Sequence, residues 1–414
     1  MTKPRALRLL LACLLALPLA ALLVGAVLLR ALAPQPGEWA APLRVGPWAP
    51  QVGVLQVLRL ATAPPFAIWL DGLHLATRWG PVRLRWMAAD RSLHLQCAPC
   101  RLATPALGTD PVQVPRLDLA VFRDFEQLHG TLSASTGTAG GPQLRAWFNG
   151  SLQDVGLALR TYLPNTPIAD VYAVLAPQLP ELRQARIAGS VTLQTRWELP
   201  SGRLRLVPQV DGFTVQGLGT EVLAHAGSSC GPPSGLRRAD WLSRAMLAAE
   251  DQRFFEHPGC DLRELQAAIA ANQAGRGGVR RGGSTLSQQL AKRDARSATR
   301  KLRELLYAVE MEQTLGKARI LQLYLDNAPW GAGLCGAEAA ARHHFGRSAR
   351  RLEPAQAVWL AAMLHNPEAE ARRRAAADDA ALARVEWVAQ GLRGGTRQRE
   401  RTALRQALPA MLPR

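Results

Sequence analysis

An uncharged apolar run near the N-terminus constrains this chain more than any other feature. The run covers 21 residues, from Leu9 to Leu29, and Lys3, Arg5 and Arg8 precede it. About 20 apolar residues are enough for a helix to cross a bilayer. The excess of positive charge before the run predicts that the N-terminus stays in the cytoplasm and that the rest is exported. The sequence therefore predicts a cytoplasmic tail and a transmembrane anchor within residues 1–33.

Two alternatives to a retained anchor depend on processing. Ala31-Leu32-Ala33 resembles a signal-peptidase site, but the apolar run is longer than that of most cleaved signal peptides. Cys13 follows Leu-Leu-Ala, a loose lipoprotein signal, yet it lies deep inside the run. We therefore expect a single-pass protein of the bacterial inner membrane whose other domains lie in the periplasm.

The net charge of the chain indicates which class of partner it binds. The 414 residues carry a formal net charge of +18, and 48% of them are hydrophobic, which is enough for a sizeable core. A chain of this length has two or three domains as a rule. The positive charge favours nucleic acid, a phospholipid surface or a phosphate-bearing substrate. Because export removes the chain from nucleic acid, an anionic lipid or a phosphorylated substrate is the expected partner.

Five of the six cysteines follow the apolar run, in a compartment where disulfides persist. Cys97 and Cys100 have redox-motif spacing, but they follow the strand-like alternation of Leu93 and Leu95. A catalytic pair opens a helix instead, so a local structural disulfide is predicted. The sequence leaves the pairing of the remaining three open, and they are Cys230, Cys260 and Cys335.

Residues 34–226 are predicted to form a β-rich module, either antiparallel β or α+β. Val82, Leu84 and Trp86 alternate with polar residues, as in a half-buried strand. A helical piece around residues 168–186 interrupts the strands. We find no chemical motif in this module. Residues 227–235 form a linker by their glycine, serine and proline content.

The periodicity becomes helical after the linker. Trp241, Leu242, Ala245, Ala248 and Ala249 follow helix spacing, and later segments repeat the pattern. We expect a mostly α domain at residues 236–370. The remaining residues, 371–414, read as a basic helical tail that is either solvated or lies on anionic lipid.

Two adjacent carboxylates, Glu250 and Asp251, close the first helix of this domain. A carboxylate at a helix C-terminus faces the negative end of the helix dipole, which favours its neutral form, and burial acts in the same direction. A raised pKa suits a general base near neutral pH. A solvated helix end is the alternative for an isolated pair of this kind.

A second candidate segment starts with Gly282-Gly283-Ser284-Thr285, in which either hydroxyl residue can be the N-cap of a helix. The free amides of such a turn favour an anion. Four cations follow, and they predict a surface that binds pyrophosphate; they are Lys292, Arg296, Arg300 and Lys301.

A third candidate is Glu304. Leu302, Leu305, Leu306 and Val309 occupy one face of its helix, so Glu304 is expected to point away from the core into a cleft. A surface ion pair with Lys301 is the alternative, and it would contribute little stability.

Together these segments resemble the ordered motifs of the family 51 glycosyltransferases, which polymerise peptidoglycan. Residues 250–259 match Glu-Asp-x-x-Phe-x-x-His-x-Gly, and residues 282–292 match Gly-Gly-Ser-Thr-x-x-Gln-Gln-x-x-Lys. Residues 300–304 match Arg-Lys-x-x-Glu, and two further motifs follow at 320–346 and 352–362. The resemblance covers residues 236 to 368 and implies a lysozyme-like, mostly α-helical fold on the membrane.

The resemblance also implies a reaction and residue roles. Glu250 would deprotonate the 4-hydroxyl of lipid II, which attacks the growing lipid-linked strand with inversion, and undecaprenyl pyrophosphate leaves. Glu304 would be the second carboxylate, in the donor site. Substrate or pyrophosphate would contact Ser284, Thr285, Gln288, Gln289, Lys292, Arg296, Arg300 and Lys301. Supporting motif residues would be Asp251, Phe254, His257, Gly259, Asn327 and Gly331.

Several positions depart from the family pattern. Arg293 stands where Asn is usual, and the loop between Lys292 and Arg296 is several residues short. Gln322 replaces a usual Glu, Asp326 a usual Asn and Cys335 a common Tyr. Because Cys260 and Cys335 both lie inside motifs, a bridge between them is one of the open pairings.

These features leave three readings. The main one is a monofunctional polymerase, since no Ser-x-x-Lys of a penicillin-binding transpeptidase occurs. The others are a catalytically inactive envelope scaffold and a lytic transglycosylase, which needs a protonated acid and no pyrophosphate site. No cofactor is required and no metal site is expected, although a divalent cation, Mg²⁺ or Mn²⁺, assists the pyrophosphate in some members. Expected partners are lipid II, the growing glycan strand, the inner membrane and cell-wall synthesis proteins that bind the β-rich module.

Overall fold

The computed structural model describes most of the chain between residues 30 and 392, and only isolated positions or short pieces nearer the two ends. The described ranges are 30–34, 36–42, 49–102, 111–153, 156–273, 282–291, 298–331, 333–376 and 379–392. The predicted anchor at residues 9–29 and the end of the predicted tail lie largely outside these ranges. Within them, no helix is both long and apolar enough to cross a bilayer.

Contacts divide the chain into two compact units. The β unit contains residues 1–102, 113–166 and 191–209, and the helical unit contains residues 103–112, 167–190 and 210–414. The predicted β-rich middle and the predicted helical C-terminal region are therefore both present. Residues 167–190 and 210–226, which the sequence placed in the β-rich module, group with the helical unit instead.

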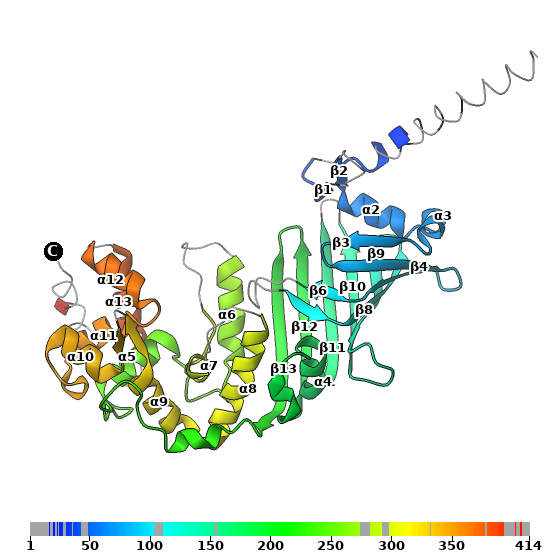
Figure 1. Cartoon of the computed structure of the whole chain (residues 1–414). Helices are drawn as coiled ribbons and strands as arrows, with labels where there is room; N and C mark the ends of the chain where they lie inside the picture. Colours follow the sequence, from blue (N-terminus) through cyan, green and yellow to red (C-terminus); the bar gives the residue numbers. More distant parts are fainter. Residues whose placement is uncertain are drawn as a thin grey trace, which may run out of the picture. The chain divides into compact units, whose positions relative to one another are not determined.

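A nine-stranded sheet forms the β unit, and the ends of β12 and β13 continue into the helical unit (Figure 1). The strand order is β13-β12-β11-β10-β9-β8-β5-β4-β3, so β3 and β13 are the two edges. The strands are β3 (His74–Thr77), β4 (Gly80–Met87), β5 (Ser92–Cys97), β8 (Arg116–Asp124), β9 (Gln127–Ser135), β10 (Gln143–Leu152), β11 (Leu157–Pro167), β12 (Arg186–Leu199) and β13 (Arg203–Gln216).

The alternation of apolar side chains explains how one face of this sheet is covered. Leu84 and Trp86 are buried, as the alternation in β4 predicts. Helix α2 (Val54–Ala61) buries Leu55 completely against Leu128 and Leu152 of the sheet. A hairpin of β1 (Ala40–Pro42) and β2 (Gln51–Gly53) precedes α2, and α3 (Pro64–Ala67) with the 3₁₀ turn η1 (Ile68–Leu70) follows it.

The predicted local disulfide is confirmed. Cys97 at the end of β5 bonds to Cys100, which begins β6 (Cys100–Leu102). β6 pairs with β7 (Val112–Val114) in a separate two-stranded sheet. This bridge closes a tight loop at the end of a strand.

The helical unit is built almost entirely from short helices. They are α4 (Ile168–Leu175), η2 (Pro180–Arg183), η3 (Thr220–Ala224), α5 (Trp241–Glu250), α6 (Leu262–Gln273), α7 (Leu286–Leu290), α8 (Ala298–Thr314), α9 (Gly316–Asn327), α10 (Ala337–Phe345), η4 (Ala349–Arg351), α11 (Pro354–Ala361), α12 (Pro367–Ala375) and α13 (Asp379–Gly391), with the hairpin β14 (Pro329–Gly331) and β15 (Leu334–Cys335). Leu242, Met246, Ile320 and Leu360 are fully buried in one core.

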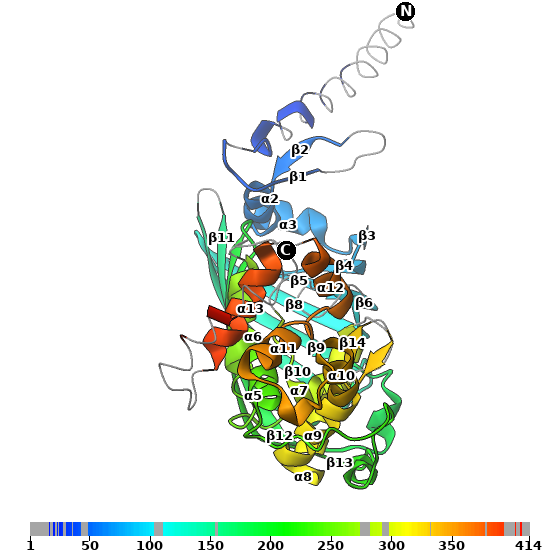
Figure 2. The same ribbon diagram turned by 90° about the vertical axis from the view of Figure 1, so that its left-hand side faces the viewer.

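Helix α13 corrects the prediction of a solvated or lipid-bound tail. Ala381, Val385, Val388 and Ala389 are buried, and α13 packs against α5 and α11 (Figure 2). Alanine and valine at helix spacing are the residues that let α13 approach α5 closely. Residues 379–392 therefore belong to the core of the helical unit.

Polar contacts explain why residues 167–190 and 217–220 group with the helical unit. Tyr172 donates a hydrogen bond from its hydroxyl to the carbonyl of Leu302, with an O–O distance of 3.0 Å. Glu181 is buried and pairs with Arg303. Glu310 is also buried, and it accepts the backbone N–H groups of Leu218 and Thr220. Each contact fixes one of these segments to α8.

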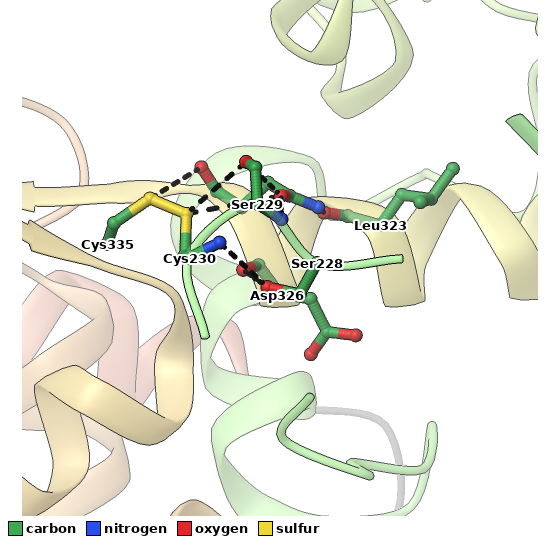
Figure 3. Close-up of a disulfide and its surroundings, with 7 residues drawn as sticks. Ser228, Ser229, Cys230, Leu323, Asp326 and Cys335 are labelled. Carbon is green, nitrogen blue, oxygen red and sulfur yellow. Dashed lines mark hydrogen bonds between the residues drawn. A yellow bond between two sulfur atoms is a disulfide. The ribbon is translucent and has the colours of Figure 1, made fainter. Parts of the chain in front are cut away.

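The predicted linker, residues 227–235, is bonded to the helical unit (Figure 3). Cys230 forms a disulfide with Cys335. The possible pairing of Cys260 with Cys335 therefore does not occur, and Cys260 has a free thiol. Ser234 donates from both its N–H and its hydroxyl to one carboxylate oxygen of Asp326. The Asp326 carboxylate, which only accepts hydrogen bonds, thereby holds Ser234 in place.

Candidate active site

Glu250 lies at the C-terminal end of α5, where the sequence predicted it. Helix α5 is buried along most of its length, with Leu242 and Met246 fully buried in the core, so the helix is fixed in position. The Glu250 side chain is only 8% exposed. Gln289 donates from its Nε2 to one carboxylate oxygen at 2.9 Å, and Arg384 Nη2 lies 3.3 Å from the other. The carboxylate is therefore oriented from both sides.

Burial raises the pKa of the Glu250 carboxyl above its ordinary value. The hydrogen bond from Gln289 and the positive charges of Arg384 and His365 oppose this rise, and the negative charge of Asp251 adds to it. Desolvation disfavours the charged form of a carboxyl group. Glu250 is thus a stronger proton acceptor, once ionised, than a solvated glutamate.

Asp251 has a different environment from its neighbour. It is buried, and it accepts hydrogen bonds from His257 Nε2 at 3.0 Å and from the backbone N–H of Leu286 at 3.0 Å. The N–H of Gly259 donates to His257 Nδ1, so Nε2 carries the proton that Asp251 accepts. Asp251 therefore positions the loop after α5 and the start of α7, and it does not compete with Glu250 as a base.

Gly259 is required by the backbone at this point. Its φ is +107°, and an added Cβ would lie 3.1 Å from the backbone atoms of Ala308 and Val309. Its carbonyl accepts the hydroxyl of Thr285 at 2.6 Å. The first and second motifs therefore meet α8 at Gly259 with no space for a side chain.

Replacing Gly259 by Ala is expected to destabilise the protein by about 1–3 kcal/mol, because a left-handed backbone strains a non-glycine residue and the new Cβ meets backbone atoms. The measurement is the thermal unfolding midpoint of the full chain. Gly346→Ala is the matched control, since Gly346 has a φ of +62° and no atom within 4 Å of a built Cβ. Equal losses in the two variants would contradict the close contact with α8.

Thr285, and not Ser284, is the N-cap of α7. The Thr285 hydroxyl accepts from the N–H of Gln288, and the Gln288 side chain accepts from the N–H of Thr285, which completes a capping box. The side-chain oxygen of Gln288 is therefore used by the cap, and its predicted contact with substrate remains a prediction. Gln289 faces Glu250, and its carbonyl oxygen accepts the hydroxyl of Tyr324 at 2.8 Å.

Ser284 and Lys301 join a buried ionic cluster around Glu304. Lys301 Nζ donates to the Ser284 hydroxyl at 2.7 Å and to Glu304 at 2.9 Å, and Arg300 Nε lies 3.3 Å from Glu304. Glu304 is only 2% exposed, so it lies buried among these polar partners. Ala308, one turn further along α8, is also fully buried. Both residues are buried because α7, α9 and η3 all pack against α8. Lys292, Arg293 and Arg296 lie outside the described residues.

Two residues of the site were not predicted from the sequence, Arg384 and Glu312. Arg384 reaches Glu250 from α13, a segment that was expected to be a separate tail. Glu312 accepts the hydroxyl of Ser287 and pairs with Lys317 at 2.8 Å, and Lys317 also lies 4.3 Å from the centre of the buried Phe254 ring. Neither residue stands out by local spacing, because each acts through contacts with a distant segment.

The remaining motif residues support the fold. The Asn327 side-chain amide donates to the carbonyl of Leu323, and its oxygen accepts from Ser229. Gly331 has a φ of +84°, and a Cβ there would lie 2.9 Å from Pro367. Both residues position the segment after α9.

No group of three or more His, Cys, Asp and Glu side chains among the described residues is placed to hold a metal ion. The buried carboxylates Glu304 and Glu312 are each paired with cationic side chains. A divalent cation that assists a pyrophosphate therefore remains a prediction.

One short segment connects the two chemical features of the site. Residues 284–289 contact Glu250 through Gln289 and the cationic cluster through Ser284. One backbone segment therefore links the Glu250 carboxylate to the cationic cluster. The transglycosylase family model matches residues 237–393, which includes α12 and α13 and extends past residue 370.

Curated relatives are also similar to part of this chain. A biosynthetic peptidoglycan transglycosylase of Pseudomonas aeruginosa is 42% identical over 196 residues, which is 44% of this chain and 77% of the relative. Proteins of the same name from Ectopseudomonas mendocina and Bordetella avium are 47% and 48% identical, over 36% and 30% of this chain. The alignments cover 62% and 55% of those two relatives. The chain belongs to the transglycosylase family.

Proposed function

We propose that this chain is a peptidoglycan glycosyltransferase that polymerises lipid II into glycan strands and releases undecaprenyl pyrophosphate. Family membership supports the reaction class, and the relatives are named for peptidoglycan biosynthesis. The proposal rests mainly on the buried Glu250 carboxylate, which Gln289 and Arg384 hold in position. Burial also raises the pKa of this carboxyl group. Neither an inactive scaffold nor a lytic enzyme is favoured by these findings.

In the proposed reaction, Glu250 accepts the proton of the acceptor 4-hydroxyl. The oxygen forms a bond to the anomeric carbon of the donor, and the bond from that carbon to the pyrophosphate oxygen breaks with inversion. A base whose pKa is raised toward the working pH transfers the proton most effectively. Gln289 and Arg384 hold the carboxylate in one orientation, which lowers the entropy cost of reaching the reactive geometry.

The leaving pyrophosphate is proposed to contact the cationic segment that follows Thr285. Among the described residues, Arg300 and Lys301 both pair with Glu304, and Lys301 also donates a hydrogen bond to Ser284. The family resemblance adds Lys292 and Arg296. Cationic side chains stabilise the negative charge that develops as pyrophosphate leaves, and Glu304 fixes their positions before substrate arrives.

We also propose that the protein is anchored in the inner membrane by the apolar run and works in the periplasm. Lipid II is a membrane lipid, so an anchored enzyme meets it on the bilayer surface. The β unit would then be available to cell-wall synthesis proteins.

The test is polymerisation of fluorescent lipid II by the full chain, purified in detergent. We expect long fluorescent products that a muramidase cleaves to disaccharide units, with release of undecaprenyl pyrophosphate. Preformed glycan strands, incubated in parallel, should keep their length. Shortened strands without new polymer would indicate a lytic enzyme, and no change in either assay, beside an active relative, would contradict the proposal.

A further inference from the structure

A dense group of exposed apolar side chains lies in the β unit, far in sequence from the catalytic motifs. Residues 64–79 contain six large apolar side chains that are at least 39% exposed. Trp69 is 85% exposed and Ile68 is 60% exposed. We call this group the Trp69 surface, and its members are Phe66, Ile68, Trp69, Leu73, Leu75 and Trp79. Contiguous exposed apolar surface on a folded protein marks an interaction site.

The packing of α3 and η1 is inverted relative to an ordinary surface helix. Ala67, the smallest residue of this segment, is fully buried against Trp86 and Leu93 of the sheet. The large side chains of Ile68 and Trp69 point outward instead. Burying a Trp or Ile would stabilise the fold far more than burying an Ala, so the outward placement serves something other than the stability of this chain.

The backbone beneath the surface is held firmly. Asp71 accepts the backbone N–H of Trp86 at 3.1 Å, which fixes the end of η1 to β4. The carbonyl of Trp79 accepts the N–H of Arg101 at 2.7 Å, beside the Cys97–Cys100 disulfide. Thr77 donates its hydroxyl to the carbonyl of Gly80 at 2.7 Å and closes the turn. These aromatic side chains are therefore presented by a fixed backbone.

The Trp69 surface follows a segment that is bonded to residues shortly after the N-terminal apolar run. The run ends at Leu29 in the sequence, and the Leu32 carbonyl accepts the N–H of Gly53 at 2.7 Å. Val54, the first residue of α2, donates its N–H to Trp39 at 2.8 Å. Helix α2 is about 12 Å long at 1.5 Å per residue, and α3 follows it (Figure 1).

Charge favours a lipid over a neutral partner. Residues 51–102 contain six arginines and two aspartates. Arg78 lies 4.5 Å from the centre of the Trp79 ring. Tryptophan is enriched at the level of lipid headgroups, and arginine pairs with their phosphates.

We propose that the Trp69 surface inserts into the interface of an anionic phospholipid bilayer. The insertion would hold the β unit against the membrane at a second point, in addition to the N-terminal run. A protein partner added to the edge strand β3 is the alternative. It is less favoured because β3 has only four residues and three of the six side chains lie on α3 and η1. The proposal does not depend on the polymerase reaction.

The test uses the full chain in which Cys13 and Cys260 are replaced by Ala, and a single cysteine labelled with an environment-sensitive dye. The probe variant is Trp69→Cys, and the matched control is Val207→Cys on β13, the opposite edge strand, where Val207 is 39% exposed. Each protein is reconstituted in vesicles of phosphatidylethanolamine and phosphatidylglycerol. We expect blue-shifted emission and quenching by spin-labelled lipid at position 69, and neither at position 207.

A second probe, Trp79→Cys, covers the case in which the first variant folds poorly, and it is expected to respond as position 69 does. Vesicles of phosphatidylcholine alone should give weaker lipid quenching at both probes. Quenching of position 69 by aqueous iodide that is the same with and without vesicles would overturn the proposal. So would equal lipid quenching at position 207, or protection of position 69 that needs envelope proteins in addition to lipid.

Discussion

Replacing Glu250 by Gln is expected to reduce the rate of lipid II polymerisation by about 10²–10⁴-fold, the usual contribution of a general base. The glutamine keeps the size and can still accept the hydrogen bond that Gln289 donates to Glu250. It cannot take a proton from the acceptor hydroxyl. The measurement is the initial rate with fluorescent lipid II at saturating substrate, and the loss should appear in kcat.

A folding control accompanies this variant. Because burial raises the pKa of Glu250 in the folded state, the folded protein binds a proton more tightly than the unfolded chain. The contribution of Glu250 to the free energy of unfolding therefore falls as the pH rises from the pKa of Glu250 in the unfolded chain through its higher pKa in the folded protein. Glu250→Gln should melt at an equal or higher temperature at neutral pH, and this gain should vanish in acid. A variant that retains the wild-type rate would rule out Glu250 as the base.

Glu256→Gln is the matched control for the same substitution. Glu256 lies in the loop after α5, its side chain is 63% exposed, and it forms a surface pair with Arg253. Surface pairs of this kind contribute little to stability. We expect wild-type polymerisation from this variant.

Features that depend on a few neighbouring residues could be predicted from the sequence. The end of α5 at Glu250 and a cap at one of the two hydroxyl residues before α7 follow from local hydrogen bonding and apolar spacing. The Cys97–Cys100 bridge spans three residues and follows a strand. The strand alternation around Trp86 likewise depends only on which face of one strand is covered.

Contacts between distant segments could not be predicted. Cys230 and Cys335 are separated by 105 residues, so spacing alone does not pair them. Glu304 is on the polar side of its own helix by sequence, but neighbouring segments bury it with two cations. Arg384 lies 134 residues from Glu250, and a single arginine between Ala383 and Val385 gives no sign of which distant segment it contacts.

Arg384 is expected to be a positioning residue for Glu250, and its replacement by Met should lower kcat roughly 10- to 100-fold, the cost of a misplaced reacting group. Its guanidinium contacts the Glu250 carboxylate at 3.3 Å and the carbonyl of Ala249 at 3.1 Å. Without it, the Glu250 side chain loses the partner on one of its two oxygens. Substrate affinity should change less than kcat.

The pH profile separates positioning from a merely structural role. The Arg384 charge lowers the pKa of Glu250, against the larger effect of burial. Removing that charge must raise the Glu250 pKa further, so a higher pH is needed to ionise the base. The acid limb of the polymerisation rate should therefore move to higher pH in Arg384→Met. Arg384→Lys, which keeps a positive charge, should restore part of the rate and return the limb toward its wild-type position.

Arg372→Met provides the control for loss of an arginine. Arg372 is exposed on α12 and is expected to leave both the rate and the acid limb unchanged. A lower rate in Arg384→Met with an unmoved acid limb would mean that Arg384 only stabilises α13 against α5. Because salt screens distant charges, the loss of Arg372 should not shift the acid limb. A shift in Arg372→Met as well would instead indicate a general effect of net charge. The distinctive result is a limb that moves for position 384 alone.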